Sequence, residues 1–261
     1  MESPGGGTDV RLHALVRNPT DGSLSGGVQP VNFPVATEMP PRRVRSAWSA
    51  TRRHGYVIYD DPAANGSGLF AFRMDSNTGA VSVLSDQPNS VFGIQARLGA
   101  LEVGRGDGFL ALVGAQGDNR AGAGAAVRFG LQADHVPDPA FVMLSDLRGA
   151  GFFAGASSVV FPDSPGAGAR GVVASAVGVG VVDFSDNTPG VGPMLDAQLA
   201  GPVTAMTAQN DSMVILANGD SVAAFEPNVG VGQVGPTLLD TFERPRVLEG
   251  YTGSVAVRCT Q

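Results

Sequence analysis

The chain has 261 residues, of which 43% are hydrophobic, and a formal net charge of −7. This length and apolar content predict a folded domain with a sizeable core rather than a largely disordered chain. All 17 basic residues are arginines, so lysine chemistry such as a Schiff base or a P-loop is excluded. The negative charge disfavours general binding to nucleic acids.

A short pattern recurs five times along the chain. In each copy an apolar or aromatic residue ends a hydrophobic run, and a turn-forming polar residue follows three positions later. The pairs are Leu15/Asn18, Phe72/Asp75, Phe129/Gln132, Phe184/Asn187 and Phe225/Asn228. Successive copies are 57, 57, 55 and 41 residues apart. This spacing is typical of four-stranded β-propeller blades, with glycines punctuating the strands.

In chain order, residues 1–9 are predicted to be a flexible segment and residues 10–261 a single domain. A first hairpin is expected from Leu12–Val16 and Val28–Val31 around a turn at 18–22, and four complete blades follow it. Their expected strands are Val44–Trp48, Gly55–Tyr59, Leu69–Arg73 and Ala80–Leu84; Leu98–Val103, Phe109–Val113, Ala126–Phe129 and Phe141–Leu144; Ser157–Phe161, Val172–Val177, Val181–Phe184 and Met194–Leu195; and Val203–Thr207, Met213–Ala217, Val222–Phe225 and Thr237–Leu239.

The two ends of the chain are expected to share a fifth blade. The N-terminal hairpin supplies its third and fourth strands, and Arg246–Glu249 and Ser254–Arg258 supply its first and second. This pairing would remove two exposed strand edges and close the ring. The sequence therefore predicts an all-β, five-bladed β-propeller whose N- and C-terminal strands share one blade. A β-sandwich or jelly roll with similar strand spacing is the alternative.

The segment Phe70–Val81 combines an aromatic strand, the turn Asp75-Ser76-Asn77-Thr78-Gly79 and an aliphatic strand. It resembles the outer hairpin of phosphogluconolactonase-type propellers, and Leu15–Leu24 is a second, looser match. The resemblance implies a propeller fold. Members of that family usually have seven blades, whereas this chain has room for five. The shared turn is structural, so it carries no catalytic residue to this sequence.

One segment departs from the acidic character of the chain and is the predicted binding site. Its arginines and histidine surround the only tryptophan, and the candidate residues are Arg42, Arg43, Arg45, Trp48, Arg52, Arg53 and His54. Clustered guanidinium groups attract anions, and an indole offers a planar surface for stacking. The alternative is that the arginines point outward from a strand while Trp48 packs between blades.

A second candidate is the tripeptide Arg105-Gly106-Asp107, which is the sequence that integrins recognise and is expected on an exposed turn; a plain strand connection is its alternative. No catalytic residue, metal site or cofactor is predicted. The histidines His13, His54 and His135 fall in different expected blades, and no G-x-S-x-G elbow occurs. Two G-x-G-x-x-G stretches lack the following helix that dinucleotide binding needs.

These observations favour a non-catalytic recognition or assembly module that binds a protein or an anionic glycan. A structural or receptor-facing component of a virus or phage particle and a lactonase-like hydrolase are the alternatives. No stretch is long and apolar enough for a membrane span, and the first residues do not form a signal peptide. The localisation is open between the cytoplasm, a particle and a processed secreted protein, as is the oligomeric state.

Overall fold

A computed structural model describes the greater part of the chain. The described residues are 10–12, 15–18, 20–26, 31–33, 44–49, 51, 53–61, 66–75, 77–85, 96–116, 124–145, 155–162, 168–175, 178–185, 190–195, 203–209, 213–218, 221–229 and 237–243. The expected strands Arg246–Glu249 and Ser254–Arg258 and the segment 1–9 lie outside these ranges.

The described residues form four antiparallel four-stranded sheets, each with its strands in chain order, and two two-stranded pairs. Blade one contains β5 (Val44–Trp48), β6 (His54–Asp61), β7 (Gly66–Met74) and β8 (Val81–Ser85); blade two contains β9 (Ala96–Val103), β10 (Phe109–Gln116), β11 (Gly124–Leu131) and β12 (Pro137–Ser145). Blade three contains β13 (Ala156–Val160), β14 (Arg170–Ser175), β15 (Gly178–Asp183) and β16 (Gly190–Leu195); blade four contains β17 (Val203–Gln209), β18 (Met213–Asn218), β19 (Ser221–Glu226) and β20 (Thr237–Glu243). The pairs are β1 (Val10–Leu12) with β4 (Val31–Phe33) and β2 (Leu15–Arg17) with β3 (Leu24–Gly26).

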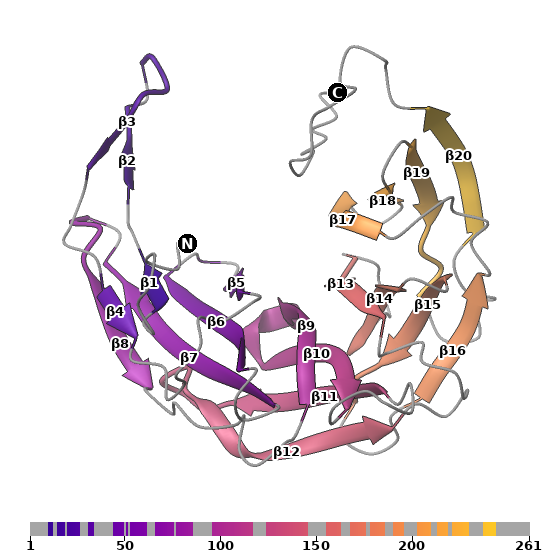
Figure 1. The fold of residues 1–261 in the computed structure, drawn as a ribbon, viewed down its shortest axis with the longest axis horizontal. Helices are drawn as coiled ribbons and strands as arrows, with labels where there is room; N and C mark the ends of the chain where they lie inside the picture. Colours follow the sequence, from indigo (N-terminus) through magenta and orange to yellow (C-terminus); the bar gives the residue numbers. More distant parts are fainter. Residues whose placement is uncertain are drawn as a thin grey trace.

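The four blades are arranged around an arc, with β5, β9, β13 and β17 on its inner side and β8, β12, β16 and β20 on its outer side (Figure 1). Neighbouring inner strands pack on one another, β5 on β9, β9 on β13 and β13 on β17. Separate sheets radiating from an axis are a propeller and not the two facing layers of a sandwich. The chain is therefore an all-β protein of the β-propeller class, and its total of five blades stays a prediction.

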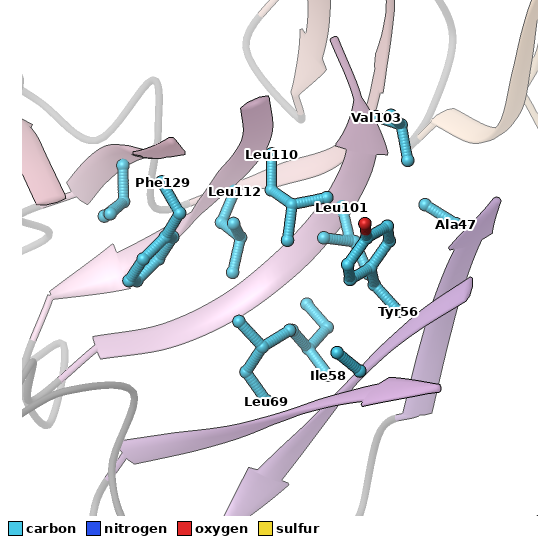
Figure 2. Close-up of a cluster of buried hydrophobic side chains, with 11 residues drawn as sticks. Ala47, Tyr56, Ile58, Leu69, Leu101, Val103, Leu110, Leu112 and Phe129 are labelled. Atoms are coloured by element: carbon cyan, nitrogen blue, oxygen red, sulfur yellow. The ribbon is translucent and has the colours of Figure 1, made fainter. Parts of the chain in front are cut away.

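The middle strands of blades one and two have long runs that are buried on both faces. Residues Gly55–Tyr59 of β6 and Phe109–Gly114 of β10 are all buried. This explains their near-continuous apolar sequences, which lack the alternation of a half-exposed strand. Figure 2 shows the resulting core between blades one and two, where Tyr56, Ile58 and Leu69 meet residues of β9, β10 and β11.

The recurring pattern corresponds to real structural positions. Phe72, Phe129, Phe184 and Phe225 are all completely buried. The polar residue three positions later begins a tight turn: the Asp75 N–H donates to the Ala80 carbonyl and the Gly79 N–H to the Asp75 carbonyl, both at 2.8 Å. Asn18 makes the same two bonds with Ser23 and Gly22, so the turns at Asn18 and Asp75 are the same structure. Asn187 lies outside the described residues.

Several predicted strand boundaries are wrong, and three of them have a local explanation. In the N-terminal hairpin the returning strand β3 begins at Leu24 and not at Val28, because the Asn18 turn already closes at Ser23. In blade three, β14 ends at Ser175, which pairs with Gly178 of β15, so the hairpin is tighter than expected. In blade two, β12 begins at Pro137, directly after a turn. The outermost strand tolerates proline there because one of its edges has no partner strand to receive an N–H.

Replacing Gly79 with alanine should lower the free energy of unfolding by about 1 kcal/mol. Gly79 has a φ of 70°, a conformation that costs energy for any residue with a Cβ. Chemical denaturation of the two proteins would measure the difference. Gly108 is the matched control, since its φ is −92° and nothing lies within 4 Å of an added Cβ. An equal loss in G79A and G108A would contradict this account of the turn.

Candidate functional site

The described part of the predicted basic segment is divided between two faces of β5. Arg45 is exposed and Trp48 is half-buried. Because they are three positions apart on a strand, their side chains point to opposite faces. The indole contacts Phe72 edge to face, with ring centroids 4.9 Å apart, and so joins the apolar face of blade one. Trp48 therefore does not form one surface with Arg45. Arg42, Arg43 and Arg52 lie outside the described residues.

A second arginine, Arg73, which the sequence did not single out, lies on the strand that neighbours the backbone of Arg53. The backbone N–H of Met74 donates to the Arg53 carbonyl at 2.7 Å, and His54 pairs directly opposite Arg73 in the β6–β7 register. Arg53 and Arg73 are both exposed. We call these two residues the arginine pair. Because side chains alternate along β7, the sequence already indicated that Arg73 and Phe72 point to opposite faces. The position of Arg73 relative to Arg53 depends on the β6–β7 pairing.

One carboxylate lies next to the arginine pair. Two backbone N–H groups, of Thr78 and Asn77, hold the pKa of Asp75 below its ordinary value, and the charge of Arg73 contributes in the same direction. The two N–H groups donate to Asp75 Oδ1 at 2.9 and 2.8 Å. Asp75 is therefore ionised at neutral pH and engaged in its own turn, so the Arg53 side of the pair is its more strongly cationic part.

The structure brings two of the scattered histidines together. The rings of His54, at the start of β6, and His135, in the β11–β12 turn, are stacked with centroids 3.9 Å apart and planes inclined by 13°. The hydroxyl of Tyr56 donates to the carbonyl of His135 at 3.0 Å. The prediction that the histidines fall in different blades is thus confirmed for this pair, and the two rings meet at the boundary between those blades. His13 lies outside the described residues.

The Arg-Gly-Asp tripeptide forms a single 3₁₀ turn, η2 (Arg105–Asp107), between β9 and β10. Gly106 is exposed, with a φ of 67°. Arg105 is half-buried, and its Nη2 donates to the carbonyl of Pro162 in blade three at 2.7 Å. The guanidinium group thus links two blades. Recognition of this tripeptide by a partner stays a prediction.

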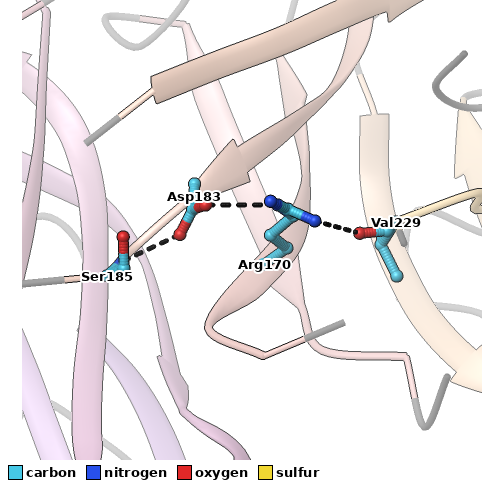
Figure 3. A network of polar contacts seen from close by, with 4 residues as sticks. All are labelled: Arg170, Asp183, Ser185 and Val229. Atoms are coloured by element: carbon cyan, nitrogen blue, oxygen red, sulfur yellow. Dashed lines mark hydrogen bonds and ion pairs between the residues drawn. The ribbon is translucent and has the colours of Figure 1, made fainter. Parts of the chain in front are cut away.

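A similar link joins blades three and four (Figure 3). Arg170, at the start of β14, forms an ion pair with Asp183 at 3.1 Å, and its Nη1 donates to the carbonyl of Val229 at 3.4 Å. Asp183 is itself fixed by the N–H of Ser185 at 2.9 Å. Tyr56, Arg105 and Arg170 therefore each donate to a backbone carbonyl of the next blade.

These three links share one end of the blades. In an antiparallel four-stranded blade, the connection between strands one and two and that between strands three and four lie at the same end. We call it the turn end. The connections at this end contain His135, Pro162, Val229, Arg53 and η2, and Arg73 lies one residue before the end of β7. The turn end thus carries both the inter-blade links and the exposed cationic residues.

One half-buried carboxyl lies on an inner strand. Burial raises the pKa of Glu102 on β9 to about 7, although the N–H of Val103, which donates to Oε1 at 3.1 Å, opposes this rise. On the middle of blade two, burial lowers the pKa of Arg128, whose guanidinium lies 4.8 Å from the centroid of the Phe109 ring. Glu102 lies one residue before the end of β9, and Arg128 lies within β11.

Within the described ranges, no cluster of three or more histidine, cysteine, aspartate or glutamate residues has the geometry to hold a metal ion. The same part of the chain contains no helix with the length and apolar character needed to cross a membrane. The arginine pair, the stacked histidines and η2 are therefore the features of the described residues on which a functional argument can be built.

Comparison with known proteins gives similarity at the level of the fold alone. No protein-family profile matches the sequence, and no curated protein sequence matches it. Among solved structures, Sqt1 from Chaetomium thermophilum has a TM-score of 0.44 and 13% identity, over 69% of this chain and 42% of that one, so this chain spans less than half of its length. A Bacteroides fragilis protein provisionally assigned as a 6-phosphogluconolactonase has a TM-score of 0.46 and 11% identity, over 90% of this chain and 82% of that one. A chain of the Mitotic Checkpoint Complex has a TM-score of 0.46 and 13% identity, with coverages of 89% and 76%.

Proposed function

We propose that this chain is a recognition module of the β-propeller class that binds a protein partner through the turn end of blade one. The observation that carries the proposal is the arginine pair: Arg53 and Arg73 are both exposed, on neighbouring segments joined by the hydrogen bond from the Met74 N–H to the Arg53 carbonyl. Two guanidinium groups held on adjacent backbone segments suit a surface that presents carboxylates. The partner is therefore expected to offer an acidic face.

The rigid support of this surface favours recognition. Arg73 belongs to β7, whose neighbouring residue Phe72 is completely buried, and the Arg53 carbonyl is hydrogen-bonded to the same strand. Side chains on a packed sheet lose less conformational freedom on binding than side chains on a free loop.

An anionic glycan remains the competing ligand predicted from the sequence. The particle-component and lactonase-like hypotheses gain no support from these contacts and stay as predictions.

The test is binding to poly-L-glutamate, used as a model acidic polypeptide, with heparin as the model anionic glycan. The wild-type chain should bind poly-L-glutamate at low salt, with an affinity that falls as salt is added. The R53S/R73S variant should bind about tenfold more weakly, because two exposed charge contacts are lost. Isothermal titration calorimetry would measure both affinities.

The R53K/R73K variant is the matched control, since it keeps both charges and should retain most of the binding. Equal affinities of wild type and R53S/R73S for poly-L-glutamate, or no binding by wild type, would contradict the proposal. Loss of heparin binding alone in R53S/R73S would replace the protein partner by a glycan.

A further inference from the structure

The boundary between blades one and two contains the stacked histidine pair described above. His54 belongs to β6 of blade one, and His135 belongs to the β11–β12 turn of blade two. Their 3.9 Å centroid separation makes the pair a direct contact across the boundary, next to the hydrogen bond from Tyr56 to the His135 carbonyl. Any change that separates the two rings therefore also acts on the junction of the two blades.

The backbone conformation of His135 is energetically unfavourable, and the contact with His54 forms in spite of this cost. His135 has a φ of 63°, where the equivalent turns of blade one and the N-terminal hairpin have glycine, at Gly79 and Gly22. A residue with a Cβ reaches this conformation only at an energetic cost. Such outliers persist where surrounding contacts hold them. Here the ring stack and the Tyr56 hydrogen bond hold His135 together with the hydrogen bond that the His135 N–H donates to the Gln132 carbonyl at 2.8 Å.

The chemistry of the pair changes with proton uptake. Imidazole is the side chain that commonly gains a proton between pH 7.5 and pH 5.5. Nδ1 of His135 is buried and has no hydrogen-bond partner among the described residues, so a proton at this atom would be a buried donor without an acceptor. Two protonated rings at the observed separation would also repel each other.

The charged groups on the elements around the histidine pair carry similar numbers of positive and negative charges. Among the groups whose side chains the structure describes, three are cationic and three are anionic, on the β5–β6 loop, β7, the β7–β8 turn, η2, the β11–β12 turn and β12. They are Arg53, Arg73, Arg105, Asp75, Asp134 and Asp138. Because these opposite charges are balanced in number, repulsion within the pair is the dominant change when both rings are protonated.

We propose that the stacked histidines form an acid-sensitive latch at the turn end. With both rings neutral, the stack and the Tyr56 hydrogen bond hold blades one and two together. When both rings are protonated, the rings separate, His135 leaves its strained backbone conformation and the boundary opens. Opening exposes residues of β6 that the contact covers, next to the arginine pair. The latch is independent of whether the arginine pair binds an acidic partner.

Hydrogen exchange followed by mass spectrometry tests the latch. After correction for intrinsic exchange rates, protection of residues 54–59 in the wild-type chain should fall by about tenfold between pH 7.5 and pH 5.5. Protection of β14 in blade three should change much less. In the H135G variant, glycine adopts the positive φ without cost, so the turn should form and the tenfold loss should disappear.

The H54F variant gives an independent measurement, because phenylalanine keeps an aromatic ring at the stack and cannot be protonated; it too should lose the acid response. H13Q is the matched control, since it removes the third histidine and should respond as wild type does. An acid response in H135G and H54F equal to that of wild type would overturn the latch, as would a wild-type chain with the same protection at both pH values.

Discussion

Replacing Gly68 with alanine should destabilise the chain by about 3 kcal/mol or more. A Cβ at this position would overlap the ring of Tyr59, which pairs directly opposite Gly68 in the β6–β7 register. Tyr59 is only 1% exposed and stacks on Phe70 with centroids 5.3 Å apart, so its ring has no free direction in which to move. Denaturant-induced unfolding of G68A and wild type would measure the loss.

Gly130 is the matched control for this prediction. It is also a strand glycine, in β11, but the nearest atom to an added Cβ is Asp138 Cβ at 3.9 Å, which is ordinary contact. G130A should therefore unfold near the wild-type midpoint. Shortening Tyr59 to valine should remove the overlap, so G68A/Y59V should lose less than the sum of the single variants. Strict additivity in that cycle would refute the steric explanation.

Replacing Glu102 with glutamine should change the dependence of stability on pH. Because the pKa of Glu102 is raised to about 7 in the folded chain, the folded state binds the proton more tightly than the unfolded state, whose pKa is the ordinary 4.5. The stabilisation from this proton is complete below about pH 4.5 and is lost as the pH rises to about 7. The total loss is roughly 3 kcal/mol above that window.

Glutamine resembles the protonated acid in shape and has no charge to bury. E102Q should therefore be more stable than wild type at pH 8 and nearly equal to it at pH 4.5. Thermal unfolding of both proteins across this range would measure the difference. The proposed histidine latch acts with the opposite sign, since it weakens the chain as the pH falls, but it is common to both proteins and cancels in their comparison. A constant difference between E102Q and wild type at all pH values would show that Glu102 does not titrate in this window.

The strands and turns of the blades could be predicted because their signals are local. A run such as Leu69–Phe72 that is buried on both faces is apolar at every position, and an Asp75 turn closes on residues within six positions of itself. The boundaries were less well predicted, as at β3, because the sequence did not show that the turn closes at Ser23. Four of the predicted blades could be recognised from these signals, whereas the fifth depends on residues that the structure does not describe.

The contacts across blade boundaries could not be predicted in the same way. Tyr56 and His135 are separated by 79 positions, and Arg105 and Pro162 by 57. Their proximity depends on how far each blade is rotated against the next, and a single sequence carries no signal of that rotation. The arginine pair lies within blade one, and the sequence did not single it out because the position of Arg73 relative to Arg53 depends on the β6–β7 register. It also left Trp48 on a predicted binding surface although its indole packs on Phe72.

The inter-blade bonds of Tyr56, Arg105 and Arg170 act at one rim of the molecule. If neighbouring blades move while these three bonds stay intact, the motion must be a rotation about that rim. The distance between blades would then vary least near the arginine pair and most at the opposite rim. A partner bound at this rim would therefore contact a surface of nearly constant shape. Separation of the blades would let solvent enter at the opposite rim.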